Sequence, residues 1–216
     1  MNAETATEPT VHLVDDDAGV RRSLSRVLRD AGFHVETHES AVAFLERPRG
    51  GGRGCLVLDV TMPGLDGLAL QQQLSDTGRA MPIVFLTGQG DIPTTVRAMK
   101  AGASDFLTKP VTSEVLVAAV RAALDQDRWA MQANTEVAEI ARRFESLTAR
   151  EREVLSAVVG GKLNKQIAAE LGVVEQTVKF HRARLMERMH ARTVAELMHM
   201  AAKLDIESGR PTTRST

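Results

Sequence analysis

The sequence has only one cysteine and contains no long hydrophobic run. Cys55 has no second cysteine with which it could form a disulfide or a thiolate metal cluster within the chain. No apolar run approaches the roughly 20 residues that a membrane-spanning helix needs. The N-terminus also lacks the basic segment followed by an apolar one that marks a secretion signal. We therefore expect Cys55 to be a small buried residue, and we expect a cytoplasmic protein with no membrane partner.

Histidines and glycines form no strong ligand motif. The six histidines are scattered, and His34 and His38 stand at the start and the exit of one predicted strand, so no zinc site is expected. Residues 49–54, Arg-Gly-Gly-Gly-Arg-Gly, resemble a phosphate-binding loop in composition. This segment precedes a strand instead of joining a strand to a helix, so a flexible connection is predicted.

The charge of the chain is unevenly distributed. Its 216 residues allow one large domain or two small ones, and 43% hydrophobic with 25% charged residues excludes global disorder and a fibrous protein. Residues 1–125 carry 12 Lys and Arg against 16 Asp and Glu, whereas residues 126–216 carry 15 against 12. This difference indicates two halves with different functions. The positive excess of the second half is too small to establish nucleic-acid binding by itself.

Short apolar runs alternate with amphipathic segments up to residue 124. The apolar spacing from Val20 to Ala31, for example, follows one face of a helix that Gly32 ends. Five strand-then-helix units are predicted, with strands at 11–14, 33–37, 55–58, 83–86 and 105–108 and helices at 20–31, 40–46, 67–75, 91–101 and 112–124. The fold class is therefore α/β, with a doubly wound, five-stranded parallel sheet covered on both faces.

Polar residues follow four of these strands. They are the acidic run that begins with Asp15 and Asp16, then Asp59, then Thr87, and then Lys109 before a proline. Because ligands of open α/β sheets bind outside the carboxyl ends of the strands, we expect these side chains to converge.

A cluster of carboxylates needs a cation between its members. Asp15, Asp16 and Asp59 would otherwise repel one another, and a hard divalent ion with oxygen ligands, Mg²⁺ first, relieves this repulsion. Asp59 is the candidate nucleophile for a phosphoryl group, since it stands alone at the tip of a predicted central strand. Lys109 can supply a second positive charge to that group and Thr87 a hydroxyl donor.

The chain is predicted to be helical from residue 126 onward. An apolar stripe in residues 126–143 and just beyond predicts a linker helix; its members are Trp129, Ala133, Val137, Ile140 and Phe144. The stripe is compatible with a short coiled coil in a dimer, and equally with packing on one of the chain's own domains.

A small all-α domain is predicted at the C-terminal end. Its first helix begins at the capping box from Thr148 to Glu151 and stops at Gly160. Asn164 is expected to cap a second helix that Gly172 ends, a third helix is predicted at 175–189, and a second capping box at 193–196 begins a fourth. Two helices joined by a short glycine-containing turn are typical of a helix-turn-helix.

The third helix has one apolar and one basic side. Val178, Leu185 and Met189 are expected in the core. The other side carries residues that are candidates for contacting the major groove of DNA: Gln176, Lys179, Phe180, Arg182, Ala183 and Arg184, with Arg188 and Arg192 further along.

The first half resembles the receiver domain of two-component response regulators, over about 10–125. The motifs are Val14-Asp-Asp-Asp17, Leu58-Asp59 with Met62-Pro63-Gly64-Leu-Asp66-Gly67, Leu86-Thr87-Gly88 and Thr108-Lys109-Pro110. Residues 88–93 and 98–106 are similar to the FixJ branch, with Gln89 and Val111 departing from its pattern. The resemblance implies a flavodoxin-like fold and a phosphoacceptor at Asp59.

The same resemblance implies further roles around that acceptor. Asp16 would bind Mg²⁺ directly, Asp15 indirectly, and the Thr61 carbonyl would be a third ligand. Thr87 and Phe106 would form a switch pair in which phosphorylation draws Thr87 inward and the Phe106 ring moves from an exposed to a buried position. The bond between Lys109 and Pro110 would be cis.

The second half resembles the LuxR/NarL-type helix-turn-helix, over about 144–204. The motifs are residues 147–155, Asn164-Lys-Gln-Ile-Ala168 and Thr177-Val-Lys-Phe-His181. By analogy, the DNA contacts would include Lys165, Thr177, Lys179 and Arg182. Val174 departs from the Ser or Thr that usually caps the recognition helix, which costs about 0.5–2 kcal/mol of helix stability.

The resulting hypothesis is a FixJ-like response regulator with disordered tails at 1–9 and 205–216. A sensor histidine kinase would phosphorylate Asp59, and the chain would form a homodimer and bind a DNA operator with two half-sites, without being an enzyme beyond phosphorylation and dephosphorylation of its own Asp59. One alternative is a DNA-binding regulator independent of phosphorylation. Another is a phosphotransferase of the haloacid dehalogenase-like kind, which would need a second acid where this chain has Thr61.

Overall fold

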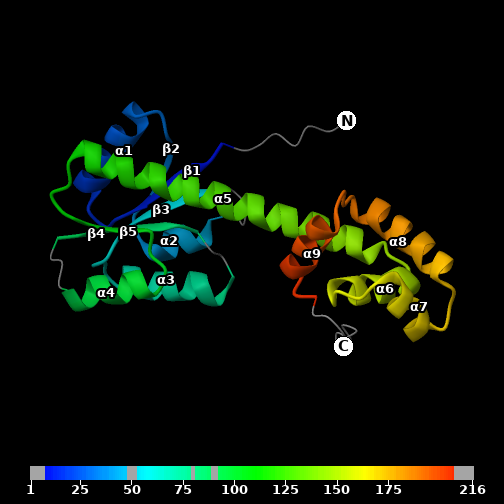
Figure 1. The fold of residues 1–216 in the computed structure, drawn as a ribbon. Coiled ribbons are helices and arrows are strands. Elements are labelled where there is room, and N and C mark those ends of the chain that lie inside the picture. Colours follow the sequence, from blue (N-terminus) through cyan, green and yellow to red (C-terminus); the bar gives the residue numbers. More distant parts are fainter. Residues whose placement is uncertain (1–7, 48–52, 79–80, 89–91, 207–216) are drawn as a thin grey trace. The chain divides into compact units, whose positions relative to one another are not determined.

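The computed structural model describes residues 8–47, 53–78, 81–88 and 92–206 (Figure 1). Predictions for residues 49–52, for Gln89 and for most of the two terminal segments lie outside these ranges. The chain divides into two units, Met1–Met131 and Gln132–Thr216.

The first unit contains a five-stranded parallel sheet in the order β2-β1-β3-β4-β5. The strands are β1 Thr10–Val14, β2 His34–His38, β3 Gly54–Asp59, β4 Ile83–Thr87 and β5 Asp105–Thr108. The helices that alternate with them are α1 Ala18–Asp30, α2 Ala41–Glu46, α3 Gly67–Asp76, α4 Ile92–Lys100 and α5 Ser113–Glu145. The predicted fold class is confirmed, and β3 is the central strand.

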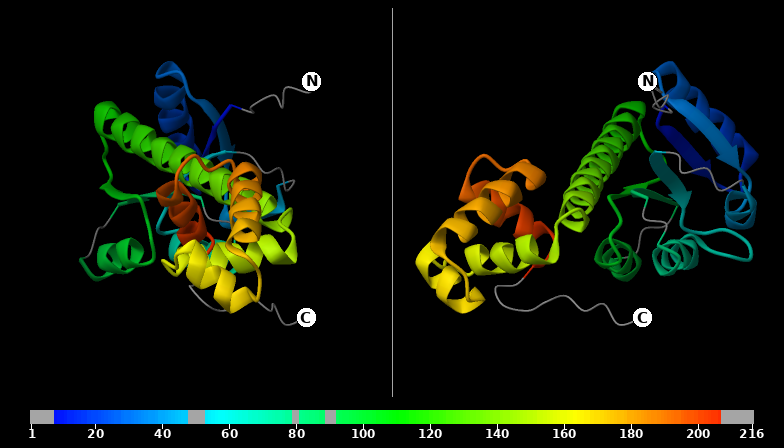
Figure 2. Two further views of the ribbon diagram at one scale, coloured as in Figure 1. Left: turned by 45° about the vertical axis from the view of Figure 1, so that its right-hand side comes forward. Right: turned by 90° about the vertical axis from the view of Figure 1, so that its right-hand side faces the viewer.

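Helices cover both faces of this sheet. Successive residues of a strand point to opposite faces, so Cys55 and Val57 of β3 join the core beneath α1 and α5, whereas Leu56 and Leu58 join the core beneath α2, α3 and α4. Figures 1 and 2 show the sheet between these two sets of helices. All six residues of β3 are buried, as expected for the centre of a parallel sheet.

The predicted break between a fifth helix at 112–124 and a linker helix at 126–143 is wrong. Both segments belong to the 33-residue helix α5. The sequence from Ser113 to Glu145 contains no glycine or proline that would end a helix, and only its pattern of apolar residues changes. Hydrogen bonds to the first unit continue past residue 125, because Gly54 donates to Asp127 at 3.2 Å and Ser104 donates to Gln126 at 2.6 Å.

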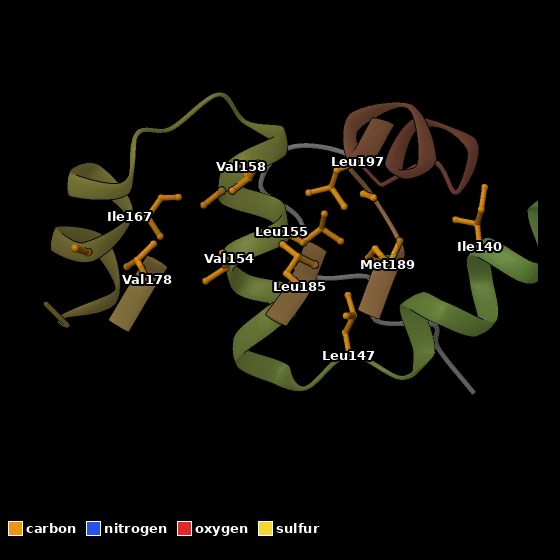
Figure 3. Close-up of a cluster of buried hydrophobic side chains, with 13 residues drawn as sticks. Ile140, Leu147, Val154, Leu155, Val158, Ile167, Val178, Leu185, Met189 and Leu197 are labelled. Atoms are coloured by element: carbon orange, nitrogen blue, oxygen red, sulfur yellow. The ribbon is translucent and has the colours of Figure 1, made fainter. Parts of the chain in front are cut away.

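The second unit packs four further helices around one apolar core. They are α6 Ala149–Val159, α7 Asn164–Leu171, α8 Glu175–Met189 and α9 Val194–Lys203, and Figure 2 shows them gathered with the end of α5. In Figure 3, side chains from all five helices point toward one another, with Leu155 and Leu185 near the middle. The prediction of a helix at 175–189 with Val178, Leu185 and Met189 buried is confirmed.

Two predicted helix caps differ from the structure. Leu163, not Asn164, is the cap of α7, because the Asn164 side chain accepts a hydrogen bond from Arg182 at 2.8 Å. At α9, Thr193 accepts from Glu196 N as predicted, but the Glu196 carboxylate accepts from Arg192 N instead of completing the box. The capping box of Thr148 and Glu151 is confirmed, and Val174 makes no side-chain cap, as expected.

The apolar stripe of the predicted linker divides into two parts. Ile140 is buried, and Phe144 packs against the core of the second unit, so these two residues pack within their own domain. Trp129 is 65% exposed and Val137 37% exposed. Within the described residues, no helix is both long enough and apolar enough to span a membrane.

Cys55 is fully buried at the start of β3, as expected. Burial, together with the nearby Asp127 carboxylate, raises the pKa of the Cys55 thiol to about 12. The thiol is therefore protonated at neutral pH and is a packing residue.

We expect Leu185→Ala to destabilise the second unit by about 2–5 kcal/mol, because Leu185 is fully buried where α6 and α8 meet and truncation leaves a cavity. Hydrogen exchange of peptides from α6 and α8 in increasing urea measures this loss. Met198→Ala, at a side chain 44% exposed, is the control and should change stability by less than about 0.5 kcal/mol. Equal losses for the two variants would contradict the described core.

Candidate functional site

Three charged side chains meet at the carboxyl edge of the sheet in the first unit. Strands β1 and β3 are paired with Val14 opposite Leu58, so the residues that follow, Asp15 and Asp59, lie side by side. Oxygens of Asp15, Asp16 and Asp59 all lie within 4.8 Å of one another. The predicted convergence of these carboxylates is therefore observed.

Lys109 joins two of these carboxylates. Its Nζ lies 2.7 Å from Asp15 Oδ2 and 3.1 Å from Asp59 Oδ2. The backbone N–H of Lys109 donates to the Thr87 carbonyl at 2.7 Å, and the bond between Lys109 and Pro110 is cis, as the resemblance implies. Burial lowers the pKa of Lys109, but the hydrogen bonds with the two carboxylates outweigh burial and hold this pKa above its ordinary value. Lys109 is therefore a permanent positive charge between the two carboxylates.

The three consecutive aspartates after β1 have different surroundings. Asp15 is fully buried, and one of its carboxylate oxygens accepts from Asp17 N at 2.9 Å while the other faces Lys109. Asp17 is the N-cap of α1 and accepts from Gly19 N at 2.6 Å and from Val20 N at 3.1 Å. Asp16 is exposed. Asp16 is thus open to an ion, whereas Asp15 is held by Lys109 and the Asp17 N–H, and Asp17 caps the helix.

Asp59 is also buried, with 6% of its surface exposed. Burial raises the pKa of its carboxyl, and the charge of Asp15 raises this pKa further, whereas Lys109 opposes both effects. A long contact of 3.5 Å joins Thr61 N to Asp59 Oδ1. The carboxylate is therefore destabilised by its surroundings and stabilised mainly by Lys109.

The two residues of the implied switch pair lie on neighbouring strands. Thr87 ends β4, next to the pairing of Asp59 with Leu86, and is 1% exposed. Phe106 is half-buried on β5, with its ring centroid 6.0 Å from that of Phe85. The structure therefore places Thr87 beside the acidic cluster and the Phe106 ring against the adjacent core.

The residues present fit a magnesium ion. Three carboxylates and one ammonium leave an excess of two negative charges in a partly buried site. All candidate donors are oxygens, which is the ligand type that Mg²⁺ prefers, and the exposed Asp16 leaves one side open to the water molecules that Mg²⁺ retains.

Gly67 brings helix α3 against the end of β3, a role that sequence reasoning missed. A Cβ atom at this position would lie 2.4 Å from the carbonyl oxygen of Asp59. The Gly67 N–H also donates to the Val60 carbonyl at 3.0 Å. Only glycine allows this close approach, and its place in the Asp66-Gly67 motif is the signal that could have revealed it.

A second group of potential ligands contradicts the expectation that the histidines are scattered. Atoms of His12, Glu36 and His38 lie within 4.8 Å of one another in the first unit. Sequence reasoning missed this group because it considered His34 and His38 of one strand and not the strand beside it. A histidine inside the apolar run of β1 was the available signal.

The second unit carries the candidate DNA-contacting residues on α7 and α8. Gln176, Lys179, Phe180, Ala183 and Arg184 are exposed on α8, and Lys165 is exposed on α7, whereas Thr177 is half-buried. The bond from Arg182 to Asn164 holds the start of α7 beside the middle of α8. Lys165 therefore lies near the same surface as the α8 residues.

Two of the basic residues have structural partners. Arg182 is half-buried and bonded to Asn164, and Arg188 donates to the Ser146 carbonyl at 2.6 Å. Lys179 forms an ion pair with Glu175 at 3.2 Å, and the Arg184 guanidinium lies 5.3 Å from the centre of the exposed Phe180 ring. The exposed basic side chains are therefore fewer than the sequence suggests.

Two known families match the chain, one within each unit. The family described as response regulator receiver domain matches residues 11–121, and the family described as bacterial regulatory proteins, luxR family, matches residues 145–201. The fold and the acidic site therefore define a receiver domain, followed by a luxR-type DNA-binding domain.

Relatives match nearly the whole chain. Nodulation protein W of Bradyrhizobium diazoefficiens is 44% identical over 96% of this chain and 91% of that protein. The transcriptional regulatory protein FixJ of Azorhizobium caulinodans is 43% identical over 88% of this chain and 90% of that protein. The solved structure of the response regulator StyR has a TM-score of 0.79 at 47% identity and covers 91% of this chain and 100% of that chain.

The chain belongs to the response regulators of the FixJ type and is a transcription regulator. A receiver domain implies a kinase as phosphodonor, and a luxR-family domain implies DNA as a partner. Receiver domains bind Mg²⁺ in an acidic pocket, which corresponds here to the cluster of Asp15, Asp16 and Asp59.

We expect Gly67→Ala to weaken Mg²⁺ binding at least about tenfold, because the added methyl would overlap the Asp59 carbonyl and force β3 and α3 apart. Isothermal titration with Mg²⁺ measures the affinity. Gly88→Ala is the control, since no atom of the described residues beyond its chain neighbours lies within 4 Å of a Cβ added there. An unchanged affinity in Gly67→Ala would show that this contact does not position Asp59.

Proposed function

We propose that a partner sensor histidine kinase phosphorylates this regulator on Asp59, and that the phosphorylated chain dimerises and binds promoter DNA in the cytoplasm. The observation that supports the acceptor is the position of Asp59. Its carboxylate lies buried at the tip of the central strand, 3.1 Å from Lys109 and grouped with Asp15 and Asp16.

Asp15, Asp16, Asp59 and the Thr61 carbonyl would hold Mg²⁺, with Asp16 and Asp59 as direct ligands. The bound ion supplies positive charge that neutralises phosphoryl oxygens during transfer. A carboxylate oxygen of Asp59 would form a bond to the phosphorus atom while the bond between phosphorus and the donor breaks, and the electron pair of that bond would stay on the donor. Lys109, already within contact of Asp59, would hold an oxygen of the transferred group.

Phosphorylation adds about −1.5 to −2 charges beside Thr87 and Lys109. The new phosphoryl oxygens are strong acceptors for the Thr87 hydroxyl, and movement of Thr87 would let the Phe106 ring move further into the space beside β4. In this way a change at Asp59 would alter the surface near α4.

The DNA-binding surface is proposed to consist of six residues of α7 and α8: Lys165, Gln176, Thr177, Lys179, Arg182 and Arg184. Exposure of Gln176, Lys179 and Arg184 along one helix supports this assignment. We propose domain limits of 10–125 for the receiver, 126–143 for the linker and 144–204 for the DNA-binding domain. Dimerisation would make binding to the second half-site intramolecular and so strengthen it.

Asp59→Asn should abolish phosphorylation, because the amide cannot act as the nucleophile. With acetyl phosphate and Mg²⁺, the unmodified chain should gain one phosphoryl group, measured by intact mass and by mobility on a phosphate-retarding gel. Asp30→Asn is the control, since Asp30 is an exposed partner of Arg26 on α1 and should leave uptake unchanged. Undiminished uptake by Asp59→Asn would refute this acceptor.

Lys179→Ala should weaken binding to double-stranded DNA by about 1–3 kcal/mol, since a long exposed cation of the proposed recognition helix is lost. The probe is the tightest fragment selected from a random duplex library, and fluorescence anisotropy gives its affinity. Lys203→Ala on α9, which removes an ion pair with Glu136, is the control and should leave affinity unchanged.

The same binding assay distinguishes regulation by phosphorylation from its alternative. Beryllofluoride, which mimics the phosphoryl group on Asp59, should increase affinity for the fragment with wild-type protein and have no effect with Asp59→Asn. Equal affinity with and without beryllofluoride would instead favour a DNA-binding regulator that does not depend on phosphorylation.

A further inference from the structure

A second cluster of potential ligands lies between strands β1 and β2, and the proposed function makes no use of it. His12 Nδ1 lies 3.3 Å from His38 Nε2 and 3.4 Å from Glu36 Oε2. His12 is 6% exposed, His38 is half-buried and Glu36 is exposed. The three ligand atoms thus lie within 4.8 Å of one another, and the Glu36 side chain is exposed to solvent.

The parallel sheet brings these residues together. Strand register pairs His12 with Glu36 and Val14 with His38. Glu36 and His38 are two residues apart on β2, so their side chains point to the same face. The Phe44 ring of α2 packs edge-on against both imidazoles, with centroids 5.4 Å from His12 and 5.3 Å from His38. Both rings are therefore held by core packing.

Hydrogen bonds between the three side chains cannot account for all the contacts within the cluster. The single Nδ1 atom of His12 faces both His38 and Glu36, and one proton on that nitrogen cannot serve both contacts. An ion pair between His12 and Glu36 would require a protonated imidazole. Burial first, and then the charge of Arg47, lower the pKa of His12 to about 4, so His12 is neutral at pH 7.

The pKa of His38 is lowered as well, mainly by burial, although Glu36 opposes this shift. Two neutral imidazoles and a carboxylate are the protonation states that a metal ion requires of its ligands. Arg47, which lies over the Phe44 ring at 4.0 Å, and His34 are the other titratable groups that act on His12. Neither imidazole therefore has to lose an excess proton before it binds an ion.

The two short distances fit a tetrahedral ion. With metal–nitrogen and metal–oxygen distances of about 2.0–2.1 Å, neighbouring ligands of tetrahedral Zn²⁺ lie about 3.3–3.4 Å apart. Both contacts of His12 Nδ1, at 3.3 Å and 3.4 Å, match this spacing. Imidazole ligands suit Zn²⁺ and similar transition metals, whereas the oxygen ligands of the acidic cluster suit Mg²⁺.

We propose that His12, Glu36 and His38 bind a transition-metal ion, Zn²⁺ first, with a fourth position open to water. The ion joins the edge strand β2 to β1 and stabilises the first unit. This site is separate from the acidic cluster in both ligands and metal preference, and it does not depend on phosphorylation of Asp59.

The test is titration of the full chain with Zn²⁺ in saturating Mg²⁺, by calorimetry, together with the visible spectrum of Co²⁺ as a substitute ion. One equivalent of Zn²⁺ should bind, and Co²⁺ should give the intense absorption of a four-coordinate site. His38→Gln and Glu36→Gln should each weaken Zn²⁺ at least about tenfold. His34→Gln is the matched control, an exposed histidine of the same strand, and should bind Zn²⁺ as the wild type does.

The change in unfolding temperature on adding Zn²⁺ is a second measurement. Each variant is compared with itself without Zn²⁺, so a general loss of stability in a variant does not produce the expected result. Zn²⁺ should raise the unfolding temperature of the wild type and of His34→Gln by the same amount, and that of Glu36→Gln by less, because its exposed side chain lies outside the core and only its affinity for Zn²⁺ is reduced. The proposal is overturned if Zn²⁺ does not bind in excess Mg²⁺, or if Asp16→Asn removes the binding while Glu36→Gln keeps it. Equal loss in His34→Gln and His38→Gln would also overturn it.

Discussion

The contact of one ammonium group with two buried carboxylates is the constraint on which the first unit depends. Asp15 is fully buried and Asp59 nearly so, and two like charges at this separation would strongly destabilise each other in a medium of low dielectric. Lys109 opposes this repulsion, with its Nζ 2.7 Å from Asp15 Oδ2 and 3.1 Å from Asp59 Oδ2. Since it neutralises only one charge, the cluster keeps the negative excess that attracts a divalent ion.

The backbone around this contact has little freedom. Lys109 is held by its own N–H, which donates to the Thr87 carbonyl, so the end of β5 is fixed to the end of β4. Asp59 is held on the other side by α3, which approaches its carbonyl through Gly67. A parallel sheet places all of these strand ends at one edge. The residues at the ends of β1, β3 and β5 therefore supply the charged groups, and the sheet sets the distances between those groups.

Sequence reasoning succeeded where a local rule was sufficient. The strand ends, the order of helices and strands and the limits of α8 follow from periodicity and turn residues alone.

Sequence reasoning failed where the outcome depended on residues distant in the sequence. Asn164 has the chemistry of a cap, but Arg182, 18 residues away, takes its side-chain oxygen. The helix end predicted at residue 124 marks the point where the side chains of α5 become mostly exposed. The helix itself continues, because no residue in its sequence breaks the backbone hydrogen bonds. The cluster of His12, Glu36 and His38 depends on the register between two strands, which periodicity within one strand does not reveal.

A count of basic residues likewise overstates the number of basic side chains that the second unit can offer for direct contact with DNA. Arg182 and Arg188 donate to Asn164 and to the Ser146 carbonyl, and so fix α7 and the start of α6 relative to α8. A guanidinium that is hydrogen-bonded in this way keeps its charge but cannot easily move to contact a DNA phosphate. Its contribution to DNA binding is therefore mainly long-range electrostatic attraction, which salt weakens. Lys179 is exposed, and its ion-pair partner among the described residues is Glu175 at i−4. Such a pair stabilises a helix by a few tenths of a kcal/mol and is easily exchanged for a phosphate. The exposed side chains of α8 are therefore accessible to a DNA ligand, whereas Arg182 and Arg188 connect the helices of the domain.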